Sequence, residues 1–315
     1  MHSSDPTRRH LLLASLALPV LPILTGCAAP LPALMNPGTA AAARALLDDS
    51  AAAHGLAALA GINDLNLRYV GTWRPLIDRL QPALADEGFR GGSEERLLLR
   101  EGVIAQAHAG PSGRKQVLRR PGRSSTSQGD VRVWFNGDEA FDADRPRAAA
   151  VVIDGYSLFL LGPMLLAQRW AAERSMTLQL AGVEYVNEHE CDVLRVRLAP
   201  GFGFSASEQI ALFIDRRERL MRRVRFSLDG LPSTVGAIAE VETFDHVTLH
   251  GVRWPTRFYE RLLKPLPLPV HDWRLTGLDV NRGLVAADVS APGFSGKALA
   301  PAAALTPGLS VQGTV

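Results

Sequence analysis

The sequence predicts an α+β protein in which helices pack against a large antiparallel β-sheet. Residues 208–263 alternate apolar and polar side chains at every second position, in runs separated by short polar turns, which is the pattern of an antiparallel meander. One nearly uncharged segment, 148–167, lies between predicted strands and indicates a buried helix. The 315 residues, 47% hydrophobic and 21% charged, are enough to form one large core.

The first 27 residues have the features of an export signal. Arg8 and Arg9 precede an apolar run that ends at Leu24 and is too short and proline-interrupted to span a bilayer, and the paired arginines resemble a twin-arginine signal. The motif Leu24-Thr25-Gly26-Cys27 resembles a lipobox, in which Cys27 receives a diacylglycerol. Ala28 at the next position suggests sorting to the outer membrane. The alternative is an ordinary secretory signal with a chance cysteine.

Residues 28–38, rich in proline, are expected to tether the lipid to the folded domain, 39–282. Acyl chains contribute about 0.8 kcal/mol per buried methylene, so a lipidated Cys27 would hold the protein at a membrane. Only Cys191 remains for the domain, which excludes an intramolecular disulfide there. A net charge of +2 argues against a global role in nucleic-acid binding.

The first half of the domain is expected to alternate short helices and strands. A helix over 40–60 passes through or breaks at Gly55, and a second helix opens at Pro75. The apolar stripe of the second helix comprises Leu76, Ile77, Leu80 and Leu84. The strands predicted here are 65–73, 96–100, 103–109, 115–120 and 131–135.

The apolar segment 148–167 is predicted to be a core helix, or two helices. Asp154 is its only charged residue, Asp144 and Pro146 give it a start signal, and Gly162-Pro163 should kink or divide it. These interruptions, and the strands on either side, argue against a membrane span.

Further strands are predicted at 176–180, 183–186, 192–198, 237–247, 252–263 and 271–280, and a disordered tail rich in alanine, proline and glycine at 283–315. Within the meander, arginines and glutamates are expected to pair across strands. These are Arg223 and Arg225 beside Glu240 and Glu242, which face Arg257 and Arg261. Such pairs set strand register, and the alternative is a charged patch that grips a ligand headgroup inside a cavity.

Signatures of catalysis are missing from the sequence, so no enzyme, catalytic residue, cofactor or metal is predicted. Neither Gly-x-Ser-x-Gly, His-Glu-x-x-His nor a Walker-type loop occurs. His246 and His250 are placed by the strand pattern about 13 Å apart, too far to share an ion, and are expected to be turn and surface residues. The cluster 188–192 and the aspartates of 138–144 are better explained as a hairpin loop and as turn and cap residues.

Several short motifs follow one another in an order that resembles the periplasmic lipoprotein-carrier family (LolA/LolB-like). They are Ala53-His54-Gly55 in the opening helix, Leu212-Phe213-Ile214-Asp215 before a turn, and Phe244-Asp245 leading to Gly251-Val252-Arg253-Trp254-Pro255. The resemblance covers 40–280. It implies a strongly curved antiparallel β-sheet, an open half-barrel, with helices packed on the concave face and an apolar cavity that carries acyl chains. The long apolar helix and the tail depart from the family.

The resemblance and the signal together suggest a membrane-anchored periplasmic lipoprotein on the periplasmic face of the outer membrane. It is expected to bind a lipid or lipoprotein acyl chain, and transport of lipids or lipoproteins in the envelope is one role that this implies. The candidate cavity or core residues are Leu212, Phe226, Trp254, Phe258 and Trp273. One alternative is a periplasmic metal-dependent enzyme that uses some of His54, His189, Glu190, His271 and Asp272. The other is an envelope sensor or assembly factor that binds a protein partner.

Overall fold

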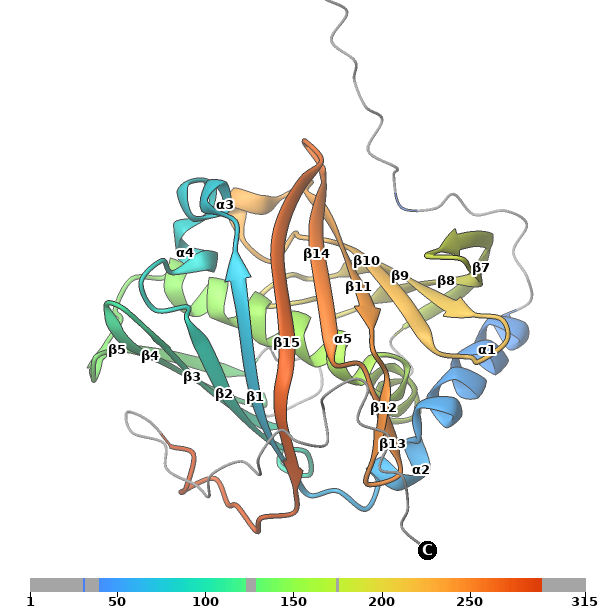
Figure 1. The fold of residues 1–315 in the computed structure, drawn as a ribbon, viewed down its shortest axis with the longest axis horizontal. Helices are drawn as coiled ribbons and strands as arrows, with labels where there is room; N and C mark the ends of the chain where they lie inside the picture. Colours follow the sequence, from blue (N-terminus) through green and yellow to red (C-terminus); the bar gives the residue numbers. More distant parts are fainter. Residues whose placement is uncertain (1–30, 32–39, 123–128, 174–175, 291–315) are drawn as a thin grey trace, which may run out of the picture.

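The computed structural model describes residue 31 and residues 40–122, 129–173 and 176–290. They form one antiparallel sheet of 13 strands, in the order β6-β5-β4-β3-β2-β1-β15-β14-β11-β10-β9-β8-β7, and a separate two-stranded hairpin (Figure 1). The predicted export signal, with Arg8, Arg9 and Cys27, lies outside the described residues, as does the tether except for Leu31.

The large sheet consists of two wings that meet where its first strand pairs with its last. At this seam Leu65 of β1 lies opposite Val280 of β15. The seam strands are β1 (Asp64–Trp73) and β15 (Leu268–Val280). One wing contains β2 (Gly92–Leu98), β3 (Val103–Gly110), β4 (Gly113–Arg120), β5 (Asp130–Phe135) and β6 (Asp138–Glu139). The other contains β14 (Arg257–Lys264), β11 (Ile238–Phe244), β10 (Met221–Ser227), β9 (Glu208–Asp215), β8 (His189–Leu198) and β7 (Thr177–Val186).

The helices lie along and at the ends of this sheet. They are α1 (Ala40–His54), α2 (Leu56–Leu59), α3 (Pro75–Leu80), α4 (Pro82–Ala85), α5 (Asp144–Glu173) and the 3₁₀ turn η1 (Pro232–Thr234). The first half of α5 packs Ile153 against Val117 and Val133 of one wing, and its second half packs against the other wing. A sheet that meets one helix from both wings must curve around it, and Figure 1 shows α5 crossing this concave face. The predicted α+β fold is confirmed.

Helix α5 is long and apolar enough to cross a membrane by length and composition alone, over Asp144–Ala172. However, 83% of its most apolar window is buried inside the protein, as predicted for a core helix. Gly162 divides the helix with φ 46° and ψ −122°, a conformation that is strained for any residue with a side chain. The predicted break at Gly162-Pro163 is confirmed.

Gly55 makes the corresponding break between α1 and α2. Its φ is 97°, and a Cβ atom here would lie 2.4 Å from the carbonyl oxygen of Gly251. The glycine therefore allows the helix end to touch the hairpin formed by β12 (Val247–Leu249) and β13 (Val252–Trp254). This hairpin corrects the single strand predicted over 252–263: Pro255, which has no N–H to donate, separates β13 from β14.

Three further predictions need correction. Leu76 and Leu80 are 48% and 53% exposed, so only part of the predicted apolar stripe of α3 is buried. The strands predicted at 176–180 and 183–186 are one strand, β7, with an irregularity between Leu180 and Val183.

The tail predicted from 283 is also shorter than expected. Val289 is fully buried in an apolar cluster with Leu118 and Trp134. The adjacent strand residues Val117 and Val133 face α5, so Leu118 and Trp134 point to the opposite face of the sheet. The segment that contains Val289 therefore covers the outer face of the first wing. Asp64 holds its start by accepting backbone N–H groups of residues 282–284. Residues 291–315 lie outside the described part.

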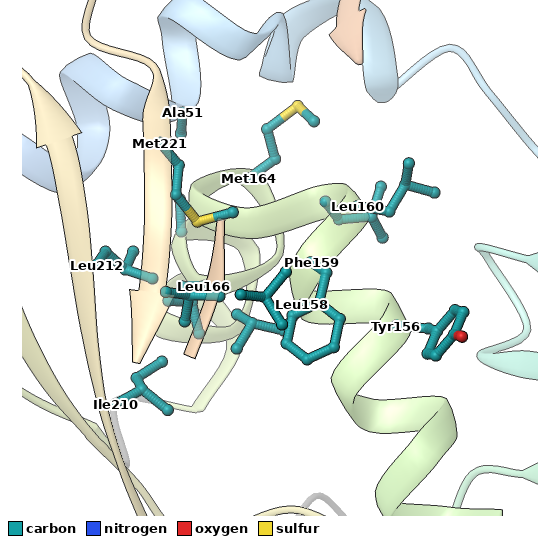
Figure 2. Packing of buried hydrophobic residues seen from close by; sticks show 14 of the residues in the cluster. Ala51, Tyr156, Leu158, Phe159, Leu160, Met164, Leu166, Ile210, Leu212 and Met221 are labelled. Atoms are coloured by element: carbon teal, nitrogen blue, oxygen red, sulfur yellow. The ribbon is translucent and has the colours of Figure 1, made fainter. Parts of the chain in front are cut away.

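The main core lies between α5 and the second wing. Figure 2 shows Leu158, Phe159 and Leu166 of α5 on the side of apolar side chains from neighbouring elements, and Leu160 and Met164 on other sides of the helix within the same cluster. Those neighbours are Ala51 of α1, Ile210 and Leu212 of β9, and Met221 of β10. This cluster fills the space between α5 and the second wing.

Candidate ligand-binding site

A cavity of about 680 Å³ lies between α5, the ends of β2, β3 and β4, and the loop between β8 and β9. Most of its lining is apolar. The apolar lining includes Leu59, Ile62, Leu97, Leu98, Leu99, Val103, Ile104, Leu158, Leu161, Leu165, Leu166, Leu198 and Phe202. Arg100 is exposed and also lines the cavity, so the cavity reaches the surface near the turn between β2 and β3. Its volume is within the range of 300–1,000 Å³ that is typical of small-molecule sites.

A polar wall faces this apolar lining. Arg119 of β4 forms an ion pair with Asp154 of α5, and the second carboxylate oxygen of Asp154 accepts the backbone N–H of Gly203 at 2.6 Å. Arg169 donates to the carbonyl oxygen of Pro200 at 2.7 Å. Burial, and to a lesser extent the nearby charge of Arg169, lower the pKa of Arg119 to about 10.

The local sequence explains how these groups reach the cavity. Alternation along β4 turns Lys115, Val117 and Arg119 toward α5. Asp154 is the lone charge in the apolar segment noted above, and a charge that is retained in a buried helix needs a partner. This lone charge is the one signal for the site in the sequence, and it also interrupts the apolar pattern of the helix. The loop around Gly203 supports Asp154 through the backbone N–H of Gly203.

The five predicted ligand residues all lie in the main core. Leu212, Phe226, Trp254, Phe258 and Trp273 are at most 2% exposed and belong to one apolar cluster. None of them is among the residues that line the large cavity. Their packing role is clear from the structure, whereas ligand contact by these residues stays a prediction.

Four rings stack in a row across the seam of the sheet. Trp73 lies on His271 with ring centroids 4.3 Å apart, His271 on Trp273 at 4.5 Å, and Trp273 on Phe258 at 5.0 Å. Tyr156 of α5 stacks on Trp273 from the helix side, and its hydroxyl lies 3.2 Å from Nδ1 of His271. The stack anchors α5 to the seam.

A buried polar cluster lies beside this stack. Gln106 donates to Glu95 at 2.9 Å, and burial raises the pKa of Glu95 to about 8. Nε2 of His108 and two guanidinium nitrogens of Arg90 have no hydrogen-bond partner within the described residues. Both side chains line a second cavity of about 20 Å³, which has room for roughly one water molecule.

Replacing Glu95 with glutamine is expected to change how stability depends on pH. The folded-state pKa of Glu95 is raised from 4.5 to about 8, so its contribution is fully present below pH 4.5 and is lost as the pH rises through about 8. In this interval Glu95 lowers the free energy of unfolding by up to about 1.4 kcal/mol per pH unit. Glu95→Gln should therefore gain stability relative to wild type between pH 5 and about 8, as measured by urea unfolding. The exposed Glu139→Gln should show no such trend, and parallel pH profiles of wild type and Glu95→Gln would contradict the prediction.

The residues proposed for a metal-dependent enzyme do not converge. His189 pairs with Asp215 at 2.6 Å, Glu190 with Arg216 at 2.8 Å, and His271 belongs to the aromatic stack. Asp272 lies 3.9 Å from Arg257. Within the described ranges, no group of three or more His, Cys, Asp or Glu side chains is placed to hold a metal ion.

His54 and His246 form a partly buried pair instead. Their ring centroids are 6.2 Å apart, and Nδ1 of His54 donates to the carbonyl oxygen of Ser50. Burial lowers the pKa of His54 to about 4 and that of His246 to about 3. His250 is exposed as predicted, whereas the expectation that His246 is a surface residue is wrong, because the strand end folds back toward α1.

The predicted cross-strand ion pairs are largely confirmed. Arg223 pairs with Glu242, Arg225 lies 2.8 Å from Glu240, and Arg261 also contacts Glu240. The predicted partner Arg257 is wrong: it lies opposite Phe244 in the register, and its carboxylate neighbour is on β15. Val224 and Phe226, which alternate with these arginines along β10, face the core, so the ion pairs lie on the opposite face of the sheet, away from α5. The alternative prediction, a charged patch that grips a ligand headgroup inside a cavity, is therefore wrong for these residues.

No family model matches this sequence, and no curated protein matches it either. Its fold is similar to that of a DUF1329 family protein from Desulfovibrio piger, with 11% identity and a TM-score of 0.46 over 78% of this chain and 96% of that one. A LolA superfamily protein from Nitrosomonas europaea is 12% identical in sequence, with a TM-score of 0.46 over 79% of this chain and 97% of that one. A putative outer membrane lipoprotein-sorting protein domain from Vibrio parahaemolyticus is 10% identical, with a TM-score of 0.37 over 80% of this chain and 97% of that one. At these identities the likeness concerns the fold alone.

Proposed function

We propose that this protein is a membrane-anchored binding protein of the cell envelope that holds a lipid or an acyl chain in the large cavity between α5 and the first wing. The observation that carries the proposal is the cavity itself, about 680 Å³ in volume, whose lining includes leucine, isoleucine, valine and phenylalanine side chains from α5, β2, β3 and neighbouring segments. Apolar surface that a ligand buries there contributes about 25 cal/mol per Å² before the costs of binding. A lipidated Cys27 would keep the protein at a membrane, where such ligands are abundant.

Native mass spectrometry with lipid extraction tests the proposal. The full chain with Cys27→Ala, exported and purified gently, should carry a discrete added mass that extraction identifies as a lipid or an acylated molecule. A protein that is always recovered without added mass, and that does not take up lipid from vesicles, would contradict the proposal.

A substitution that fills the cavity is expected to weaken binding about tenfold or more. Ser157 lines the cavity from α5 and is half-buried, so Ser157→Trp should place an indole in the space that the ligand occupies. The measurement is displacement of an apolar fluorescent probe by lipid. Ala171→Trp is the matched control, because it adds the same ring to an exposed position of the same helix outside the cavity lining. Equal affinities of the two variants would place the ligand elsewhere.

A further inference from the structure

We infer that the ligand of this cavity is an amphiphile with a single long acyl chain, such as a free fatty acid or a lysophospholipid, rather than a molecule with two or three chains. The inference rests on the proposed function and adds the number of chains that the site accepts.

The first step is the volume of the cavity. A methylene group takes up close to the share of one water molecule in the liquid, roughly 30 Å³, so a 16-carbon chain needs roughly 500 Å³. The cavity, with about 680 Å³, holds one such chain. Two chains need roughly 1,000 Å³ by the same measure. A phospholipid, or a lipoprotein whose cysteine bears a diacylglycerol, therefore has one chain too many.

The second step is the shape of the cavity. The lining residues of α5 recur at every third or fourth position, so each half of the helix turns one face to the cavity. Six of them show the spacing: Asp154, Ser157, Leu161, Leu165, Gln168 and Ala172. The lining continues past the break at Gly162, so the cavity is elongated along α5. An elongated apolar space suits one extended chain better than two chains side by side.

The third step is the packing on the other side of α5. Leu212, Trp254 and Phe258 are at most 2% exposed and belong to the cluster that fills the space between α5 and the second wing. The second cavity, beside the aromatic stack, has a volume of about 20 Å³, which is room for roughly one water molecule. Protein side chains therefore occupy the part of the concave face along which a second acyl chain would have to lie.

The fourth step is the position of the headgroup. Arg100, Gly102 and Pro121 line the cavity and are exposed, so the cavity opens to solvent between the turn from β2 to β3 and the end of β4. Leu158 and Leu161 line it and are at most 3% exposed. A ligand with one chain can thus keep its polar headgroup in water at this opening while its chain is buried along the two leucines.

Ligands that differ in the number of chains test this inference. The full chain with Cys27→Ala is incubated with vesicles that contain equal amounts of hexadecanoate, a lysophosphatidylglycerol and the matching phosphatidylglycerol, and native mass spectrometry identifies what is bound. The protein should carry one single-chain lipid per molecule and at least about tenfold less phosphatidylglycerol, because the second chain finds no apolar surface to bury. The mass of the bound lipid tells a fatty acid from a lysophospholipid.

The outcomes separate the inference from the proposed function. Two hexadecanoates per protein, or a preference for phosphatidylglycerol, would overturn the inference and leave the proposed function standing. Binding of none of the three lipids would refute the proposed function.

A series of fatty acids measures the limit directly by displacement of an apolar fluorescent probe. Each added methylene should tighten binding about fourfold, the equivalent of about 0.8 kcal/mol, until the chain fills the cavity. From the volume, this rise should end between about 16 and 22 carbons. A rise that continues unchanged beyond this length would overturn the inference.

Two substitutions of opposite expected sign assign this limit to the cavity. Ser157→Trp reduces the free volume, so the rise should end at shorter chains, whereas Leu165→Ala enlarges the cavity and should move the end to longer chains. Leu165 is only partly buried, so Leu165→Ala serves as the test if Ser157→Trp does not fold. Ala171→Trp, outside the lining, is the control and should leave the limit unchanged. A limit that stays in place in Leu165→Ala, or that moves equally in Ala171→Trp, would overturn the inference.

Discussion

Replacing Trp273 with alanine is expected to lower the free energy of unfolding by about 3–5 kcal/mol, the range for removal of a buried aromatic side chain. Trp273 is 2% exposed and stacks with His271, Phe258 and Tyr156, so its removal opens a hole at the point where α5 meets the seam. Urea unfolding followed by circular dichroism measures the loss.

Trp170 gives the matched comparison. It is only partly buried, beside Arg44, and Trp170→Ala should cost clearly less than Trp273→Ala. Equal losses for the two tryptophans would mean that the stack contributes nothing special to stability. If Trp273→Ala instead folded normally but lost ligand binding, the predicted role of this residue in the ligand site would be supported and the large cavity would not be the whole site.

Replacing Asp86 with alanine is expected to cost about 3–5 kcal/mol, because it leaves a buried charge without its partner. Asp86 forms ion pairs with Lys115 and with Arg145, and the side chains of Asp86 and Lys115 are only 1% and 2% exposed. Lys115→Met should be much milder, since Asp86 keeps Arg145 and the methionine fills a similar space.

The same pair predicts a pH dependence. Burial already lowers the pKa of Lys115, and without Asp86 this pKa should fall further. The folded variant then loses the proton of Lys115 at a lower pH than folded wild type does, so the stability deficit of Asp86→Ala should shrink as the pH rises from the folded-state pKa of Lys115 in the variant to that in wild type. Equal losses in Asp86→Ala and Lys115→Met, or a deficit that does not change with pH, would show that Lys115 is not charged in the folded protein.

Local patterns in the sequence were sufficient for most of the sheet. Alternation and turn residues predict strand register wherever a wrong register would turn apolar side chains to water, and for that reason the pairing of Arg223 and Arg225 with Glu242 and Glu240 was correct. Arg257 was misplaced because the hairpin of β12 and β13 interrupts the meander and shifts the strand that follows. Because the inserted residues also alternate between apolar and polar, the periodicity of the sequence does not reveal such an insertion.

Such local sequence patterns could not predict the cavity. In its wall, Arg119 of β4 forms an ion pair with Asp154 of α5, and its lining includes residues of β2 and of the loop before β9. These segments come together only because the sheet curves, and the degree of curvature cannot be predicted from local sequence patterns. The aromatic residues chosen from the sequence are large and apolar, and such side chains fill a core more often than they border an empty space. Leu76 and Leu80, by contrast, were expected to be buried but are exposed. The spacing of apolar residues on a short helix does not reveal whether another part of the protein covers them.

The pairing of β1 with β15 has a consequence for folding. The first wing can form hairpins from neighbouring segments, and so can the second, but the seam joins the two ends of the domain and cannot close until Leu268–Val280 has left the ribosome. Until then β1 is an unpaired edge, which favours aggregation. Such long-range closure makes folding slow, and a chain truncated before β15 should remain dependent on chaperones.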